Sequence, residues 1–146
     1  MLGRVALPVR HSAWAWTVIL LSVINDILDY SKIEAQKLDL EPRPANIRQS
    51  LAVTHDLFAQ QINDKALQFK LKIGKEVPEF LILDDTRLRQ VIVNLVANGI
   101  KFTEKGMVSV TVTAEFLANA TINLWVAVKD SGIGISPEQM ERLFQP

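Results

Sequence analysis

The sequence lacks cysteine and lacks a surplus of charge of either sign, and each absence excludes a class of protein. Without cysteine the 146-residue chain has no disulfide framework, thiolate metal site or cysteine nucleophile, and its two histidines, His11 and His55, are too few for a histidine-rich metal site. Sixteen basic residues balance sixteen acidic ones, so no overall field draws the chain onto nucleic acid or anionic lipid. With 49% apolar residues, the chain is expected to fold as a globular domain.

A long hydrophobic run is also missing. The apolar stretch that starts at Ala13 is interrupted by Asn25 and is roughly half of the about 20 residues that a membrane-spanning helix needs. We expect a buried helix or an irregular start here. A secretory signal peptide is the alternative: Arg4 and Arg10 before the apolar stretch favour it, and the absence of a small-residue cleavage site before Asn25 opposes it.

The segment 19–38 has the spacing of a helix with a narrow apolar seam, which typically packs against a neighbouring helix in the same chain or in a partner. Steps of four and three along this segment connect Leu21, Ile24, Leu28, Ser31, Ala35 and Leu38. Pro42 and Pro44 end the helical pattern, because proline lacks an N–H donor and pushes the preceding residue toward extended geometry. A domain boundary is therefore expected near residue 40.

After this boundary, helical and extended patterns alternate. The patterns predict helices over 46–65 and 85–102, strands over 68–73 and 80–83, a hairpin of strands 107–116 and 121–129, and a short helix from Ser136. In the first of these helices, the residues on or near one apolar face are Ile47, Leu51, Leu57, Phe58 and Ile62. Because the strands come in adjacent pairs, the fold class is α/β, a two-layer α/β sandwich with a mixed sheet rather than a doubly wound parallel sheet.

The helix 85–102 has two distinct sides. At about 100° per residue, one side gathers the apolar positions Leu88, Val91, Ile92, Leu95 and Gly99, and another gathers the polar positions Arg87, Gln90, Asn94, Asn98 and Lys101. Amide oxygens four residues apart can coordinate one hard cation, and a lysine one turn further can meet a phosphate. An ordinary solvated helix face is the alternative, although such faces usually mix glutamate with lysine.

A second candidate segment, 129–135, follows a predicted strand. Gly132 and Gly134 indicate backbone that turns sharply or lets a ligand approach, and the carboxylate of Asp130 can accept a hydrogen bond from the exocyclic amine of a purine. A plain turn is the alternative. The segment is neither a Walker loop nor a Rossmann loop, because it lacks Gly-Lys-Ser/Thr and a third glycine at the required distance.

Together these segments resemble the catalytic domain of hybrid-type sensor histidine kinases of two-component systems, in the GHKL ATPase group with gyrase and MutL. Residues 87–103 resemble the N box of that family, 130–134 its first glycine box, 141–146 the opening of its F box, and 23–35 the end of its second dimerisation helix. The resemblance thus covers most of the chain from Ile24 to Pro146, and implies that the two-layer domain is a Bergerat-type ATP-binding domain preceded by part of a dimerisation helix.

The resemblance implies ATP and Mg²⁺ as cofactors. Asn98 matches the magnesium-binding asparagine of the family, and Asn94 faces the same ion from one turn earlier. Lys101 matches the lysine that contacts phosphate, and Phe102 the aromatic residue that flanks the nucleotide. Hydrolysing relatives have a glutamate in place of Asn94, and because an asparagine has no useful basicity, the site is expected to hold ATP for another nucleophile.

The glycine-box resemblance implies that Asp130 reads adenine and that Gly132 and Gly134 shape the pocket wall. Gly99 stands where the family usually has alanine. The phosphoacceptor box is not recognisable, since neither His11 nor His55 has matching neighbours, so no catalytic residue is assigned. The ATP lid and second glycine box would follow residue 146, and residues 1–18 match nothing, so the chain is expected to be a fragment incomplete at both ends.

The implied layout is 1–18 unassigned, 19–38 the end of the dimerisation helical domain and 39–146 the ATP-binding domain. The implied enzyme is a protein histidine kinase, whose intact parent transfers the γ-phosphoryl of Mg-ATP to a histidine for relay to a receiver aspartate. It would be a cytoplasmic homodimer with a response-regulator partner and no nucleic acid, reaching a membrane only through other parts of the parent. The fragment alone is expected to be inactive. The alternatives are a GHKL-type ATPase, a non-catalytic dimerisation or regulatory module, and a membrane-attached form that uses the run 13–24.

Overall fold

The computed structural model describes residues 24, 27–32, 35 and 38–142, and divides the chain into two compact units, Met1–Leu40 and Glu41–Pro146. In the first unit, residues 24 and 27–32 are helical. Leu38 is not helical, so the expectation of a helix reaching that residue is wrong. The hydroxyl of Ser31 donates to Ile27 O at 2.9 Å, and Ala35 N donates to Ser31 O at 3.1 Å, both at the four-residue spacing of a helix. Residues 1–18, including His11, and the seam residue Leu21 lie outside the described residues.

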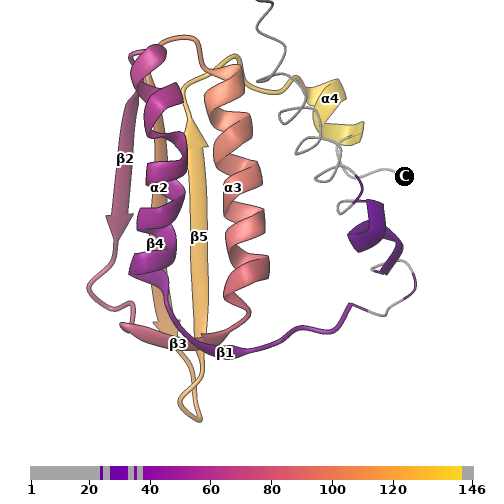
Figure 1. Ribbon diagram of the computed structural model, residues 1–146, viewed down its shortest axis with the longest axis vertical. Coiled ribbons are helices and arrows are strands. Elements are labelled where there is room, and N and C mark those ends of the chain that lie inside the picture. The colour runs from indigo at the N-terminus through magenta and orange to yellow at the C-terminus, as the bar shows by residue number, and fades with distance from the viewer. Residues whose placement is uncertain (1–23, 25–26, 33–34, 36–37, 143–146) are drawn as a thin grey trace, which may run out of the picture. The chain divides into compact units, whose positions relative to one another are not determined.

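The second unit has two layers, as Figure 1 shows: the helices α2 (Ile47–Asp64) and α3 (Asp85–Phe102) lie side by side over one face of a three-stranded sheet. In that sheet β2 (Gln68–Ile73) is parallel to β4 (Met107–Phe116), and β4 is antiparallel to β5 (Ile122–Asp130). A last short helix, α4, spans Pro137–Arg142. The predicted two-layer α/β sandwich with a mixed sheet is confirmed. Within the described part of the chain, no helix has the length and apolarity needed to cross a membrane.

The core lies between the helices and the sheet. Its fully buried members come from α2, α3 and β4 in similar numbers, with further residues from the connecting loops: Ile47, Leu51, Phe58, Ile62, Leu67, Val77, Ile92, Val96, Ile100, Val108, Val110 and Val112. Leu57, which the sequence pattern put near this face, is 61% exposed and does not belong to it. Alternate residues of β4 point into the core, as expected for a strand with one covered face.

The helix α2 is capped at both ends by hydrogen bonds with residues next to it in sequence. The side chain of Asn46 accepts hydrogen bonds from Arg48 N at 3.0 Å and Gln49 N at 3.2 Å, which caps the first turn. At the other end Ala66 adopts φ +51°, Ala66 N donates to Asn63 O, and Leu67 N donates to Ile62 O, each at 3.0 Å. These two bonds form a Schellman motif, which satisfies the last carbonyls of the helix from its own following residues.

One strand was not expected. The strand β1 (Arg43–Asn46) pairs antiparallel with β3 (Phe80–Leu83) in a separate two-stranded sheet. Pro42 and Pro44 obscured it in the sequence, because proline cannot donate to a ladder and is confined to edge strands. A strand of four residues beside a single partner tolerates that loss.

The buried side of α3 differs from the predicted side. Ile92, Val96, Gly99 and Ile100 are buried, whereas Val91 and Leu95 are 55% and 45% exposed. The close approach at Gly99 explains the rotation: a Cβ added there would lie 3.3 Å from Val108 Cγ1. Because the sheet meets the helix along this line, the positions 92, 96 and 100 face the core and their neighbours 91 and 95 are turned about 100° away.

Candidate functional site

The two segments singled out in the sequence meet at one end of the domain. Figure 1 shows that α3 and β5 both end at the upper edge of the layers. The amide of Ile133, in the loop after β5, donates to Phe102 O in the last turn of α3 at 3.3 Å. The loop 131–134 is thereby attached directly to the end of α3, the helix that carries the polar stripe. We use this name for the polar side of α3, which consists of Arg87, Gln90, Asn94, Asn98 and Lys101.

Gly132 is required by this attachment. A Cβ at that position would overlap the carbonyl oxygen of Phe102 and would also lie 2.8 Å from Asp130 Oδ1. Gly134 is required for another reason: its φ of +72° is in the left-handed region, and the space around it is open. Each of the two glycines thus meets a different constraint, one steric and one conformational.

The carboxylate of Asp130 is held in a defined orientation at the end of β5. Its Oδ1 accepts a hydrogen bond from Gly132 N at 2.8 Å, while the residue as a whole remains exposed. A Cβ added at Gly99 would lie 3.5 Å from Asp130 Cβ, so α3 passes close to this carboxylate. An oriented, exposed carboxylate beside a glycine loop can accept a hydrogen bond from an amine of a ligand.

Two further residues shape this end of the domain, and the sequence reading missed them. Ser131 N donates to Met107 O at 3.0 Å, and Met107 N donates to Ser131 Oγ at 2.9 Å, which ties the loop to the start of β4. Gly106 has φ +126°, and a Cβ there would overlap Ser131 Oγ. A glycine between a helix and a strand was a signal that could have been noted, whereas the serine contact joins residues 24 apart in sequence.

The polar stripe of α3 divides into two parts. Near the start of the helix, Arg87 and Gln90 are partly buried, and Arg87 Nη1 donates a hydrogen bond to Gln90 Oε1 at 3.0 Å. Toward the end of the helix, Asn94, Asn98 and Lys101 are exposed. Only this second half is available to a ligand in the manner that the sequence predicted.

Phe102 and Lys101 stand next to each other at the end of the stripe. The ring of Phe102 belongs to a residue that is 46% exposed, and Lys101 Nζ lies 5.1 Å from its centroid, a cation–π arrangement. An exposed aromatic face and an ammonium at one place can serve a ligand that has both a planar ring and negative charge.

The residues of α3 suit a magnesium ion that arrives with phosphate. Among the described residues, no group of three or more histidine or acidic side chains could hold a metal ion. Asn94 and Asn98 offer amide oxygens one turn apart on an exposed face. Mg²⁺ prefers six oxygen ligands and usually completes them with water and substrate phosphates, so two amides and a triphosphate form a chemically suitable set.

The short helix α4 follows the glycine loop, and a capping box stabilises its N-terminus. Ser136 N donates to Gln139 Oε1 at 3.1 Å, and Gln139 N donates to Ser136 Oγ at 3.3 Å. A hydrogen bond from the Ser136 side chain lowers the pKa of Glu138, in the first turn. The last two residues of α4, Glu141 and Arg142, are the first two of the predicted F box. The remaining residues of the F box, 143–146, lie outside the described part.

Comparison with known proteins now gives the family. Residues 83–146 match the family model described as "Histidine kinase-, DNA gyrase B-, and HSP90-like ATPase". The chain is 44% identical over 126 residues to the signal transduction histidine-protein kinase BarA of Escherichia coli K12, and 40% identical over 126 residues to the sensor protein GacS of Pseudomonas syringae pv. syringae. Each match covers 86% of this chain and only 14% of the relative.

Solved structures agree with this fold. The histidine kinase AdeS of Acinetobacter baumannii superposes with a TM-score of 0.73 at 21% identity, over 92% of this chain and 64% of that one. Full-length ShkA in complex with AMPPNP gives 0.65 at 29% identity, over 82% and 25%. The histidine kinase ThkA in complex with the response regulator protein TrrA gives 0.55 at 22% identity, over 96% and 41%.

The fold and these matches indicate a class first: residues 83–146 match the model of the histidine kinase-, gyrase- and HSP90-like ATPase family. Within that class, the chain is similar over 126 residues to sensor histidine kinases. It spans about one seventh of the length of these relatives.

Proposed function

We propose that residues 41–146 bind Mg-ATP for a sensor histidine kinase, whose reaction transfers the γ-phosphoryl group to a histidine side chain and leaves ADP. The observation that carries the proposal is the attachment of the Asp130–Gly134 loop to the end of α3 through Ile133 N and Phe102 O. That attachment brings an oriented carboxylate, an exposed aromatic ring and an ammonium to one end of the domain. The likeness to ShkA, solved with AMPPNP, also supports it.

Each residue has a chemical role in this proposal. Asp130 accepts a hydrogen bond from the exocyclic amine of adenine, and Gly132 and Gly134 let the ring approach the loop. Lys101 contacts phosphate, and Phe102 flanks the nucleotide. Asn94 and Asn98 supply amide oxygens to Mg²⁺, which when bound neutralises phosphate charge and orients the γ-phosphoryl group. All four of the polar side chains are exposed at the surface that the ligand would reach.

Hydrolysis of ATP by this domain is the rival activity. Activation of water needs a general base, and the asparagine at position 94 has none to offer. We therefore expect no steady release of phosphate from ATP by the chain. Steady hydrolysis that disappears in an Asn94→Ala variant would contradict this assignment and favour an ATPase.

The remaining parts of the proposal concern the whole protein. We propose that the segment that contains the helical residues 27–32 belongs to a dimerisation domain that pairs with its copy in a homodimer. We propose a response-regulator receiver as the phosphoryl acceptor, in line with the ThkA complex with TrrA, and a cytoplasmic location for this part of the protein. A non-catalytic module that dimerises with an intact kinase is the alternative if nucleotide does not bind.

Calorimetric titration of the chain with Mg-ATP tests the central claim. We expect Asn98→Ala to weaken binding about tenfold or more, since an ion-coordinating oxygen is lost, which corresponds to about 1.4 kcal/mol. Gln60→Ala removes an exposed amide from α2 instead and should leave the affinity unchanged. Absence of binding at millimolar Mg-ATP, or equal effects of the two variants, would refute the proposal.

A further inference from the structure

The last turn of α3 is not closed by the residues that directly follow it. Thr103, its C-cap residue, has an extended conformation with φ −108° and ψ +116°, and the next residue, Glu104, has no positive φ, so the left-handed residue that usually satisfies the last carbonyls is absent. Those carbonyls still need donors, because a helix leaves up to four of them without intrahelical partners. One, Phe102 O, accepts from Ile133 N.

The other carbonyls of this turn accept from a single side chain on α2. Lys65 Nζ donates to Ile100 O at 2.5 Å, to Thr103 O at 3.2 Å and to Lys101 O at 3.3 Å. An ammonium group has three N–H donors, so these contacts use all of them. Lys65 therefore has no donor left for a phosphate group, and its contribution is to hold backbone.

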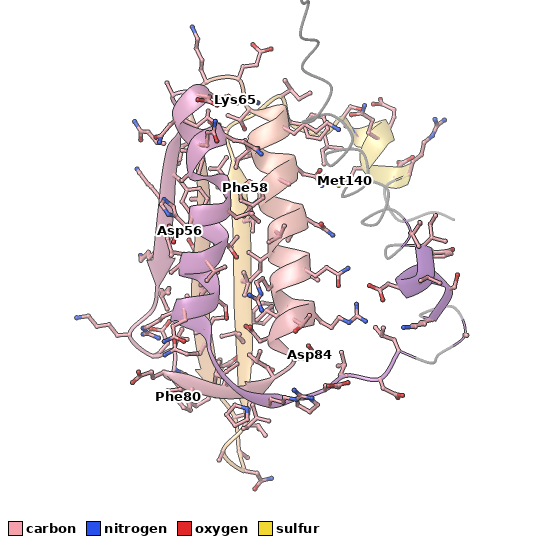
Figure 2. All side chains as sticks on the ribbon, in the orientation of Figure 1. Asp56, Phe58, Lys65, Phe80, Asp84 and Met140 are labelled. Carbon is pink, nitrogen blue, oxygen red and sulfur yellow. The ribbon has the colours of Figure 1, made fainter. Side chains whose placement is uncertain are left out.

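The position of Lys65 is electrostatically favourable for this task. Lys65 is the C-cap residue of α2, and Figure 2 shows it at the end of α2 beside the end of α3. The negative ends of both helix dipoles therefore meet at one positive charge. This arrangement fixes the end of α3 relative to α2, and Lys101 and Phe102 lie within the turn that it holds.

We propose that Lys65 is a positioning residue for nucleotide binding: by holding the carbonyls of residues 100, 101 and 103, it sets the backbone from which Lys101 and Phe102 reach the ligand. This inference rests on the proposed function. Lys65 acts through the turn it caps and does not touch nucleotide. Its replacement changes the affinity for Mg-ATP because the ligand must then order a looser turn, a cost that preorganisation avoids.

The test compares Lys65→Met, which keeps the aliphatic stem and removes the donors, with Lys65→Arg, which keeps charge and donors. Lys105→Met is the matched control, because it removes the charge of an exposed lysine two residues beyond Thr103. Two measurements are made on each folded variant: the ¹³C shifts of the carbonyls of residues 100, 101 and 103 without nucleotide, and the Kd for Mg-ATP.

We expect Lys65→Met to shift these carbonyl signals and to weaken Mg-ATP binding about tenfold, equivalent to about 1.4 kcal/mol. Lys65→Arg should recover most of the affinity, and Lys105→Met should change neither measurement. Unchanged carbonyl signals in Lys65→Met would refute the contact itself. Moved signals with an affinity equal to that of Lys105→Met would refute the positioning role, even if Lys65→Met unfolds more easily. Failure of the unaltered chain to bind would refute the proposed function, and the nucleotide-free signals would still decide whether Lys65 holds the turn.

Discussion

The helices α2 and α3 are alike in most respects and differ at their ends. Both have 18 residues, both begin at a capping side chain, and both bury one side in the same core. They run in the same direction, side by side (Figure 1). Yet α2 closes its last turn with its own backbone, whereas the last turn of α3 is closed by Lys65 and by the amide of Ile133.

This difference separates a supporting helix from one that carries a site. A Schellman motif satisfies the last carbonyls of α2 without partners from other elements. The end of α3 depends on partners from α2 and from the glycine loop, so three segments that are distant in sequence are joined there. These contacts fix the positions of the exposed polar groups on α3 and on the glycine loop relative to each other, so that they can bind one ligand.

The largest expected effect tests whether the two helices share the core equally. Ile47→Ala in α2 and Ile92→Ala in α3 remove side chains that are 0% and 2% exposed, so each should lower the free energy of unfolding by about 2–5 kcal/mol. Urea unfolding measures both. Leu57→Ala and Leu95→Ala are the exposed controls and should stay within about 0.5 kcal/mol. An Ile92→Ala variant as stable as Leu95→Ala would show that the described face of α3 is wrong.

The next effect tests the contact between the glycine loop and the end of α3. Gly132→Ala places a Cβ against the carbonyl oxygen of Phe102, and overpacking of this kind costs about 1–3 kcal/mol. Gly134→Ala has open space around it and meets only the strain of φ +72°, about 1 kcal/mol. Thermal or urea unfolding should therefore rank Gly132→Ala as the less stable variant. The reverse order would indicate that the loop does not contact α3 as described.

A smaller effect of opposite sign is expected at the end of α2. Ala66 has φ +51°, which glycine adopts without the steric cost that alanine meets, so Ala66→Gly should stabilise the domain by about 1 kcal/mol. Ala59→Gly, inside the same helix, should instead destabilise it by about 1 kcal/mol. If both substitutions destabilise equally, the Schellman geometry of α2 is incorrect.

The smallest effect distinguishes the two helix starts by pH. Hydrogen bonds from the backbone N–H groups of Glu41 and Arg87 lower the pKa of Asp84, the cap of α3, whereas Asn46, the cap of α2, does not titrate. The stabilisation by Asp84 is therefore complete above the unfolded-state pKa and is lost as the pH falls through the lower folded-state value. Unfolding free energies of the unaltered chain and Asp84→Asn should converge on acidification. The control is Asn46→Ser. Its difference in unfolding free energy from the unaltered chain should not shrink on acidification, because neither side chain titrates.

Local signals made much of the fold predictable. The helices after Asn46 and Ser136 and the helix 85–102 start as expected, and the strands 68–73, 80–83 and 107–116 have the expected bounds. The strand β1 was missed because Pro44 within it suits only an edge strand, and sequence alone cannot reveal where an edge lies. The buried side of α3 was misjudged because its rotation is set by contact with β4 at Gly99.

The sequence predicted which segments form the site, but not the contacts that hold these segments together. The two motifs were identified from residue types and order, and the structure brings Phe102 and Gly132 together. Lys65 and Ser131 support this junction through hydrogen bonds to residues that are distant in sequence. Gly106 supports it from the turn between α3 and β4, where a Cβ would overlap Ser131 Oγ. Such tertiary contacts leave no periodic pattern, so no reading of one sequence could assign them.

The parallel pairing of β2 with β4 has a consequence for the order in which the domain folds. The connection between these strands contains β3 and the whole of α3, so the pairing of Gln68 with Met107 closes a long loop around the helix. The β4–β5 hairpin needs only a short turn and can form early, while long-range parallel pairing carries a larger entropic cost and comes late. The sheet is therefore expected to become complete only after the hairpin next to the glycine loop has formed.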